Sequence, residues 1–307
     1  MRTSVNQQTL LRRVLKGDRQ ALARAISIVE SEGKESRQLL SAMKHPSRAF
    51  VLGLTGPPGT GKSTLVDRLI ELYRKKGLRV GVVAVDPTSP ITGGALLGDR
   101  IRMTRHTNDP DVFIRSMASR GWSGGLSRTT AQVIQLMDAA GFDIILLETV
   151  GIGQSDIEVV GVAHAVIVVL MPGLGDDIQV SKAGLMEIGD IYAVNKGDLE
   201  GADSMVVSVL SMVRDLKSRS PPVLKVSALK GEGLEILISS IDAIRARFDG
   251  GDQEIKLKSL RGMMLEMAKG DLLQSFTAKA EAKTQKLAKD VLSGKLTLAQ
   301  AAARLEK

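Results

Sequence analysis

The run GPPGTGKST, residues 56–64, combines glycines, a lysine and hydroxyl side chains in the order of a phosphate-binding loop. It matches G-x-x-x-x-G-K-[ST] in full, directly after a predicted strand and at the start of a predicted helix. Glycines let backbone N–H groups converge on phosphate oxygens, and the helix start adds partial positive charge. We expect Lys62 to reach the outer phosphates and the Ser63 hydroxyl to bind Mg²⁺. The predicted phosphate-binding residues are Gly56, Pro57, Pro58, Gly59, Thr60, Gly61, Lys62, Ser63 and Thr64.

A second motif, NKGD at residues 195–198, indicates the base of the nucleotide. It follows the predicted strand DIYAV and fits Asn-Lys-x-Asp, the guanine-binding motif of P-loop GTPases. An aspartate accepts hydrogen bonds from both N1–H and the 2-amino group of guanine, whereas adenine lacks that pair of donors. The motif SAL follows the strand VLKVS and matches the loop whose backbone supports the guanine carbonyl. The predicted base-binding residues are Asn195, Lys196, Asp198, Ser227, Ala228 and Leu229.

Acidic residues at the ends of predicted strands are candidates for a metal site. Asp86 and Glu148 both end strands, and open α/β sheets bind ligands at the carboxyl ends of their strands. Asp99 follows Asp86 by thirteen residues. It is either a metal ligand or an ordinary solvated aspartate in a loop. Mg²⁺ bound with nucleotide keeps several waters, so we expect some of these acids to act through water. The predicted metal ligands are Ser63, Asp86, Asp99 and Glu148.

The stretch LLETVGIGQSD, residues 146–156, leaves two interpretations open. Nucleotide-hydrolysing switch proteins usually carry Asp-x-x-Gly here, but this chain has Glu148 followed by Gly151. It is either a nucleotide switch with an altered acid or an ordinary strand-to-loop turn that ends in a glutamate.

Short β-branched runs alternate with helical stretches from Phe50 onward. The runs are FVLGLT, RVGVVAV, DIILLE, AVIVVLM, DIYAVN and PVLKVS. Continuous apolar strands separated by helices are typical of a parallel sheet covered on both faces. The predicted fold class is therefore α/β: a P-loop NTPase with a doubly wound, mostly parallel sheet and helical extensions at both ends.

The two ends of the chain show helical rather than strand spacing. The first segment predicts two amphipathic helices broken near Gly17. The tail is helical with expected breaks at Gly262, Gly270 and Gly294. We divide the chain into an N-terminal helical extension (1–48), a P-loop GTPase domain (49–248) and a C-terminal helical segment (249–307).

Composition narrows the class of protein. The 307 residues are 43% apolar and include no cysteine, which excludes disulfides and thiolate metal sites. No apolar run approaches the roughly 18 residues that span a bilayer, and the N-terminus lacks the apolar core of a secretory signal. We therefore expect a soluble, cytoplasmic protein without a membrane partner. Despite a net charge of +8, one tryptophan (Trp122) and 3% aromatics predict no nucleic-acid partner.

The motifs in their order resemble those of the methylmalonyl-CoA mutase-associated GTPases, the MeaB/ArgK family. They are GPPGTGKST, AVDPTSP-x-TGGALLGDRIRM, SRG-x-x-GG, ETVGIGQSD, MPGLGDD-x-Q-x-x-K and NKGD. The resemblance runs from about residue 8 to the last helices and is densest from 50 to 230. It implies that Glu148 takes the position of the usual switch aspartate, with Asp86 and Asp99 near the metal.

The resemblance also implies how the protein is controlled. The loop PGLGDDIQVSK would be a third mobile switch, in which Asp176 and Lys182 occupy positions tied to activation and partner signalling, as does Arg102 upstream. With Lys62 and Glu148, these three residues form the predicted catalytic set. The implied reaction is slow hydrolysis of GTP with Mg²⁺, stimulated by a partner.

The implied biology is that of an accessory protein. The resemblance predicts a homodimer formed through the C-terminal helices and a client that is a coenzyme-B12-dependent acyl-CoA mutase. The GTPase would gate cobalamin loading and protect the mutase.

Three alternatives remain. A GTP-dependent metallochaperone would need His or Cys clusters, but the chain has no cysteine and its histidines, His45, His106 and His164, are far apart in sequence. A transport-associated ATPase or kinase is disfavoured by Asp198. A non-hydrolysing scaffold is disfavoured by the intact Lys62 and Glu148.

Overall fold

The computed structural model describes residues 2–43, 48–86, 104–119, 126–127, 129–149, 158–173, 184–216 and 221–305. The chain divides into two compact units, Met1–Met263 and Met264–Lys307. The first unit contains the sheet and both nucleotide motifs. No helix in the described ranges is both long and apolar enough to cross a membrane.

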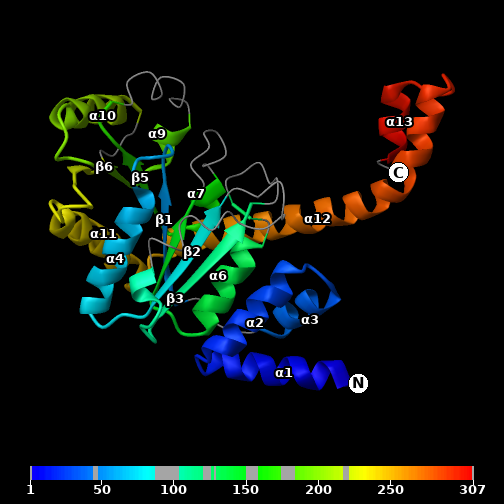
Figure 1. The fold of residues 1–307 in the computed structure, drawn as a ribbon, viewed down its shortest axis with the longest axis horizontal. Helices are drawn as coiled ribbons and strands as arrows, with labels where there is room; N and C mark the ends of the chain where they lie inside the picture. The colour runs from blue at the N-terminus through cyan, green and yellow to red at the C-terminus, as the bar shows by residue number, and fades with distance from the viewer. Residues whose placement is uncertain are drawn as a thin grey trace. The chain divides into compact units, whose positions relative to one another are not determined.

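Seven strands form a single parallel sheet in the order β3-β2-β4-β1-β5-β6-β7 (Figure 1). The strands are β1 (Phe50–Thr55), β2 (Val80–Asp86), β3 (Val112–Ala118), β4 (Ile144–Glu148), β5 (Ala165–Leu170), β6 (Ile191–Val194) and β7 (Val223–Lys225). Every residue of β1, β2, β4 and β5 is buried, as expected where helices cover both faces of a sheet. The predicted α/β fold with a parallel sheet is confirmed.

Helices lie on both faces because successive strand residues point in opposite directions. On one face, Phe50, Leu52 and Leu54 of β1 join the buried cluster that includes α4 (Lys62–Lys75) and α11 (Leu234–Asp249). Gly53 points the other way, toward Val159 of α7 (Val159–Val162). On that face α6 (Thr130–Ala139) also packs on β2 and β4. Among the described residues of this unit, the other elements between β2 and β7 are η1 (Thr104–His106), α9 (Leu185–Ile188) and α10 (Ala202–Leu216).

Strand β3 was not among the predicted strands. Its burial is uneven, because Arg115 and Ser116 interrupt the apolar run at the edge of the sheet. The Arg115 guanidinium forms an ion pair with Glu30 at the end of α2. A charge on an edge strand protects it from unwanted strand pairing, and it also hides the strand from a search for apolar runs.

Three helices precede the sheet: α1 (Arg2–Leu15), α2 (Arg19–Glu30) and α3 (Lys34–Ala42). The predicted break near Gly17 is observed, and the Asp18 carboxylate caps α2 by accepting from the N–H groups of Gln20 and Ala21, both at 3.0 Å. The third helix was not predicted. Helix α2 contacts α6 (Figure 1), and α1 contacts it too, so these two helices pack on the part of the chain that holds the sheet.

The long helix α12 (Gln253–Leu292) runs through two of the three predicted breaks. Gly262 and Gly270 both lie inside it, so those two breaks are wrong, whereas the helix ends before Gly294. Gly262 has a packing role, because a Cβ there would lie 1.9 Å from the Gly161 carbonyl oxygen. The second unit comprises the rest of α12 and α13 (Leu298–Leu305).

Candidate nucleotide-binding site

The loop 56–61 connects β1 to α4 at the carboxyl edge of the sheet. Two of its glycines have backbone angles that other residues rarely adopt, with φ +139° at Gly56 and +87° at Gly61. Space is also limited: a Cβ at Gly56 would lie 2.1 Å from the Val169 oxygen, and one at Gly61 would lie 2.4 Å from Asn195 Nδ2. The loop therefore follows the tight course that brings backbone N–H groups toward a phosphate.

Lys62 begins α4 and folds back over the loop. Its Nζ donates to the carbonyl oxygens of Gly56, at 2.8 Å, and Pro57, at 3.1 Å. The residue is 6% exposed, so the ammonium lies in a sheltered position over the loop. A cation held there is suited to neutralise phosphate oxygens that the loop binds.

Ser63 and Glu148 meet at this edge. The Ser63 hydroxyl donates to Glu148 Oε1 at 2.6 Å. The sheet register explains the contact, because Leu54 of β1 pairs with Glu148 of β4. A strand-to-loop turn does not require such a bond to the phosphate loop, so the geometry favours the nucleotide-switch interpretation of Glu148.

Asp86 ends the neighbouring strand β2, which pairs with β4 through Ala84 and Glu148. Asp86 and Glu148 are each 3% exposed. Two buried carboxylates and a serine hydroxyl on adjacent segments supply the hard oxygen donors that Mg²⁺ prefers, so the described residues fit this ion. Within the described ranges, no three or more His, Cys, Asp or Glu side chains form a metal-binding group.

Asn195 joins the predicted base loop to the phosphate loop. Its Nδ2 donates to the Thr60 oxygen at 2.8 Å, and its Oδ1 accepts from the Ala228 N–H at 3.0 Å. One buried side chain therefore connects residues that lie 135 and 33 positions away. The next residue, Lys196, has φ +56°, and an uncommon conformation of this kind is often found at functional sites.

Asp198 lies beside the SAL loop. Its Oδ1 accepts from the Ser227 hydroxyl at 2.8 Å, and the Lys230 amine lies 3.5 Å from Oδ2. The Ser227 hydrogen bond is the main cause that lowers the pKa of Asp198, with smaller contributions from its own backbone N–H and Lys230. The carboxylate is therefore anionic at neutral pH and able to accept two hydrogen bonds from a guanine edge.

Five of the predicted site residues lie outside the described residues: Asp99, Arg102, Gly151, Asp176 and Lys182. Their proposed roles stay predictions. The described ones come from five segments: the phosphate loop, the end of β2, the end of β4, the NKGD segment after β6 and the SAL loop after β7.

Arg68 was missed by sequence analysis. Its Nε donates to the Ala228 oxygen at 2.9 Å, and its Nη2 donates to the Leu229 oxygen at 3.0 Å. No short motif contains this residue. The available signal was its place on the helix that follows the phosphate loop, six residues after Lys62.

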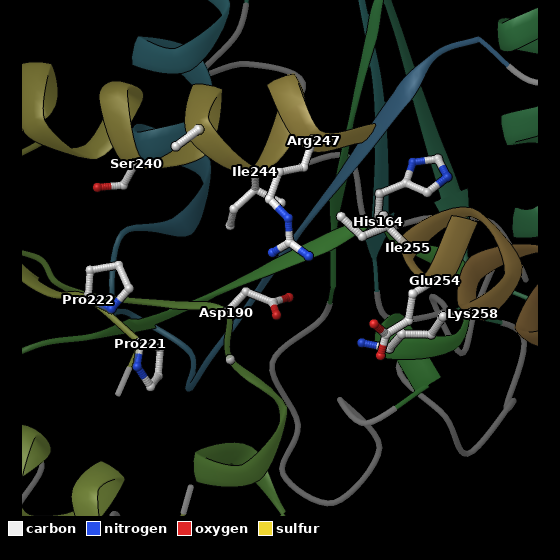
Figure 2. Close-up of a pocket in the computed structure, with 12 residues that line it drawn as sticks. His164, Asp190, Pro221, Pro222, Ser240, Ile244, Arg247, Glu254, Ile255 and Lys258 are labelled. Atoms are coloured by element: carbon white, nitrogen blue, oxygen red, sulfur yellow. The ribbon is translucent and has the colours of Figure 1, made fainter. Parts of the chain in front are cut away.

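A cavity of about 540 Å³ lies at the opposite edge of the sheet (Figure 2). It is lined by residues just before β5, β6 and β7, by α11 and by the first turns of α12. Two of its charged groups already serve the fold, since Asp190 Oδ2 accepts from the Val166 N–H at 2.9 Å and Arg247 pairs with Asp252 at 2.6 Å. Because its lining lies at the amino edge of the sheet, the cavity is separate from the nucleotide loops.

Known proteins are similar to this chain in sequence and in fold. A GTPase of Pyrococcus abyssi is 50% identical over 241 residues, which is 76% of this chain and 74% of that protein. GTPase ArgK of Escherichia coli is 39% identical over 246 residues, 75% of this chain and 74% of that protein. The crystal structure of an LAO/AO transport system kinase has a TM-score of 0.69 and 27% identity, and the match covers 98% of this chain and 97% of that chain.

A family model agrees with these similarities. The model for methylmalonyl Co-A mutase-associated GTPase MeaB matches residues 22–281, which include the phosphate loop, Glu148, Asn195 and Asp198. Since this match spans most of the chain, the protein belongs to the MeaB family of P-loop GTPases.

Proposed function

We propose that this GTPase is an accessory protein of a coenzyme-B12-dependent mutase of the methylmalonyl-CoA type, where it gates cofactor loading and protects the mutase. Support for the mutase comes from the family match over residues 22–281. The residues of the candidate site support GTP as the nucleotide that controls this loading.

The observation that carries the nucleotide part is the pair of hydrogen bonds made by Asn195, to Thr60 and Ala228. They connect the loop that would hold the phosphates to the loop that would face the base. In this proposal Asp198 accepts from N1–H and the 2-amino group of guanine, and the amides of the SAL loop face its carbonyl oxygen. A nucleotide bound this way is held at both ends by one connected set of loops.

Hydrolysis would use water as the nucleophile on the γ-phosphate. Lys62 neutralises the outer phosphate oxygens, and Ser63, Asp86 and Glu148 would hold Mg²⁺ directly or through its waters, with Asp99 as a further ligand. Mg²⁺, when bound, supplies positive charge to the phosphate oxygens. The Ser63 hydroxyl lies 2.6 Å from Glu148 Oε1, and this closeness supports a role for both side chains at one small ligand.

Control of the rate is assigned to Arg102, Asp176 and Lys182, and Gly151 is assigned to nucleotide binding. A cation positioned on the transition state is worth ~10³ to 10⁵ in rate. Moving Lys182 in or out would therefore make a low intrinsic rate respond strongly to a partner.

The C-terminal segment is proposed as the contact between two copies. In the second unit, Met264 and Leu272 are each 69% exposed, and Leu265, Leu273 and Phe276 are exposed as well. An apolar surface of this kind on a helix is typical of a protein interface. A homodimer in the cytoplasm, with residues 249–307 as its contact segment, is consistent with this surface.

The second candidate function is that of a transport-associated kinase, because a structure with that name has the same fold. It predicts use of ATP. The carboxylate of Asp198 disfavours it, since adenine offers no pair of donors to that group.

The test uses the purified chain and a B12-dependent acyl-CoA mutase from the same organism. We expect a complex with a non-hydrolysable GTP analogue and its loss with GDP, together with faster GTP hydrolysis when the mutase is added. Lys182→Ala should keep GTP affinity but lose the stimulation. Equal mutase binding with GTP analogue, GDP and no nucleotide would contradict the proposal, and so would unchanged stimulation in the variant.

A further inference from the structure

Arg68 holds the SAL loop from the phosphate-binding helix. Its Nε and Nη2 donate to the consecutive carbonyl oxygens of Ala228 and Leu229, at 2.9 and 3.0 Å. The remaining Nη1 donates to Glu71 Oε2 at 3.1 Å, one turn further along α4. The planar guanidinium holds its donors in a fixed fork, whereas the ammonium of lysine is a compact group on a flexible stem.

The bond to the Ala228 oxygen also sets the direction of the next amide. A trans peptide group is planar, so its C=O and N–H point in opposite directions. When Arg68 fixes the Ala228 carbonyl on the α4 side, the Leu229 N–H is directed away from α4. Among the described residues, no group accepts a hydrogen bond from the Leu229 N–H.

The other polar groups of this loop have partners that do not depend on Arg68. The Ser227 N–H donates to the Glu232 oxygen at 2.9 Å, and the Ala228 N–H donates to Asn195. The Ser227 hydroxyl binds Asp198. Loss of Arg68 would therefore affect the Leu229 amide more than the carboxylate that would bind the 2-amino edge of guanine.

We propose that Arg68 is a positioning residue for guanine selectivity, which holds the Leu229 N–H toward the O6 carbonyl of the base. The inference rests on the base-binding role proposed above for residues 195–198 and 227–229. Arg68 touches no part of the nucleotide in this arrangement, so its effect is exerted through the loop backbone.

The test compares three nucleoside diphosphates by calorimetry with the full chain and Mg²⁺. GDP has both the O6 carbonyl and the 2-amino group, IDP lacks the 2-amino group, and 2-aminopurine riboside diphosphate lacks O6. We expect Arg68→Gln to weaken GDP and IDP by the same factor, roughly tenfold, because both use the O6 contact. Binding of the 2-aminopurine nucleotide should stay within about twofold.

Two further variants control for charge and helix packing. Lys75→Gln removes the same charge from the same helix, and Lys75 pairs with the same Glu71 at 3.0 Å. It should leave all three affinities unchanged. Arg68→Lys, which keeps the charge but lacks the planar fork of donors, should give a loss between those of the wild type and Arg68→Gln.

Two outcomes in Arg68→Gln would overturn the inference alone. One is unchanged GDP affinity, and the other is an equal loss for all three nucleotides, which would point to damage of the phosphate loop. A wild-type chain that binds GDP no better than the 2-aminopurine nucleotide would instead refute the base-recognition proposal, and this inference with it.

Discussion

The two edges of the sheet both bury polar side chains, but they use them differently. At the carboxyl edge, Ser63, Glu148 and Asn195 bond between loops that come from distant parts of the chain. At the amino edge, His164 bonds within the core: its Nδ1 accepts from the Val51 N–H at 2.9 Å. The imidazole also packs against Phe50 and Phe248, with ring centroids 5.8 and 4.3 Å away.

This difference separates the side chains suited to ligand binding from those that stabilise the fold. Side chains that connect separate segments can exchange those bonds for bonds to a ligand, whereas a buried ring packed on aromatic neighbours stabilises the folded state. Substitutions at the carboxyl edge should therefore change nucleotide affinity more than the free energy of unfolding. Those at the amino edge should do the reverse.

The largest effect is expected for Lys62→Ala. Removing the ammonium over the phosphate loop should weaken GTP binding about a thousandfold, because charge-assisted bonds to phosphate are lost in a sheltered site. The midpoint of thermal unfolding without nucleotide should change little. Titration calorimetry and thermal unfolding measure the two quantities, and a large fall in the unfolding midpoint with normal GTP affinity would remove the contrast between the edges.

A substitution where α7 and α12 cross should lower stability strongly. Gly262→Ala would place a Cβ 1.9 Å from the Gly161 oxygen, so α7 and α12 must move apart. We expect the free energy of unfolding to fall by about 3 kcal/mol, as in other overpacked sites. Gly33→Ala is the matched control, because the nearest atom to its Cβ would be 3.9 Å away. Equal denaturation midpoints for the two variants would show that the close crossing of the helices is unimportant.

The smallest effect is a dependence of stability on pH at the amino edge. Burial, and to a lesser degree the charge of Lys256, lowers the pKa of His164 from 6.5 to about 4. The unfolded chain therefore binds more protons between these values, and protonation would also break the bond from Val51. Stability should be constant above pH 6.5 and should fall by about 1 kcal/mol per pH unit on acidification toward pH 4.

The control for this prediction is His164→Asn, whose amide oxygen can accept from Val51 without titrating. Urea denaturation at several pH values should give a shallower dependence for the variant. The same slope in both proteins would assign the acid sensitivity to other groups.

Much of the fold could be predicted because its signals are local. Apolar runs marked six strands, and glycines with Lys62 marked the phosphate loop. Strand β3 was not predicted because Arg115 breaks its apolar run. The partner of Arg115, Glu30, lies 85 residues away in the sequence. The wrong breaks at Gly262 and Gly270 have a related cause. A glycine that weakens a helix locally is kept at position 262 by a contact with Gly161, which no local pattern reveals.

The candidate site was less completely predictable. Ser63 and Glu148 do meet, and Asn195 joins two of the motif loops. Arg68, however, binds the backbone of another loop, and any sequence in that loop would offer carbonyl oxygens. A contact to a main-chain atom does not require a particular residue type at the contacted position, so no sequence motif records it. The roles of Asp176 and Lys182 depend on family resemblance, because both residues lie outside the described part of the chain.

The crossing of α7 and α12 has one mechanical consequence. Side chains between two helices act as a soft layer, since they can change rotamer as the helices shift. Here the Gly161 and Gly262 backbones touch directly, and Ser259 Oγ is bonded to the Val162 oxygen at 3.1 Å. A displacement of α7 would meet no such layer, so the first turns of α12 must move with it.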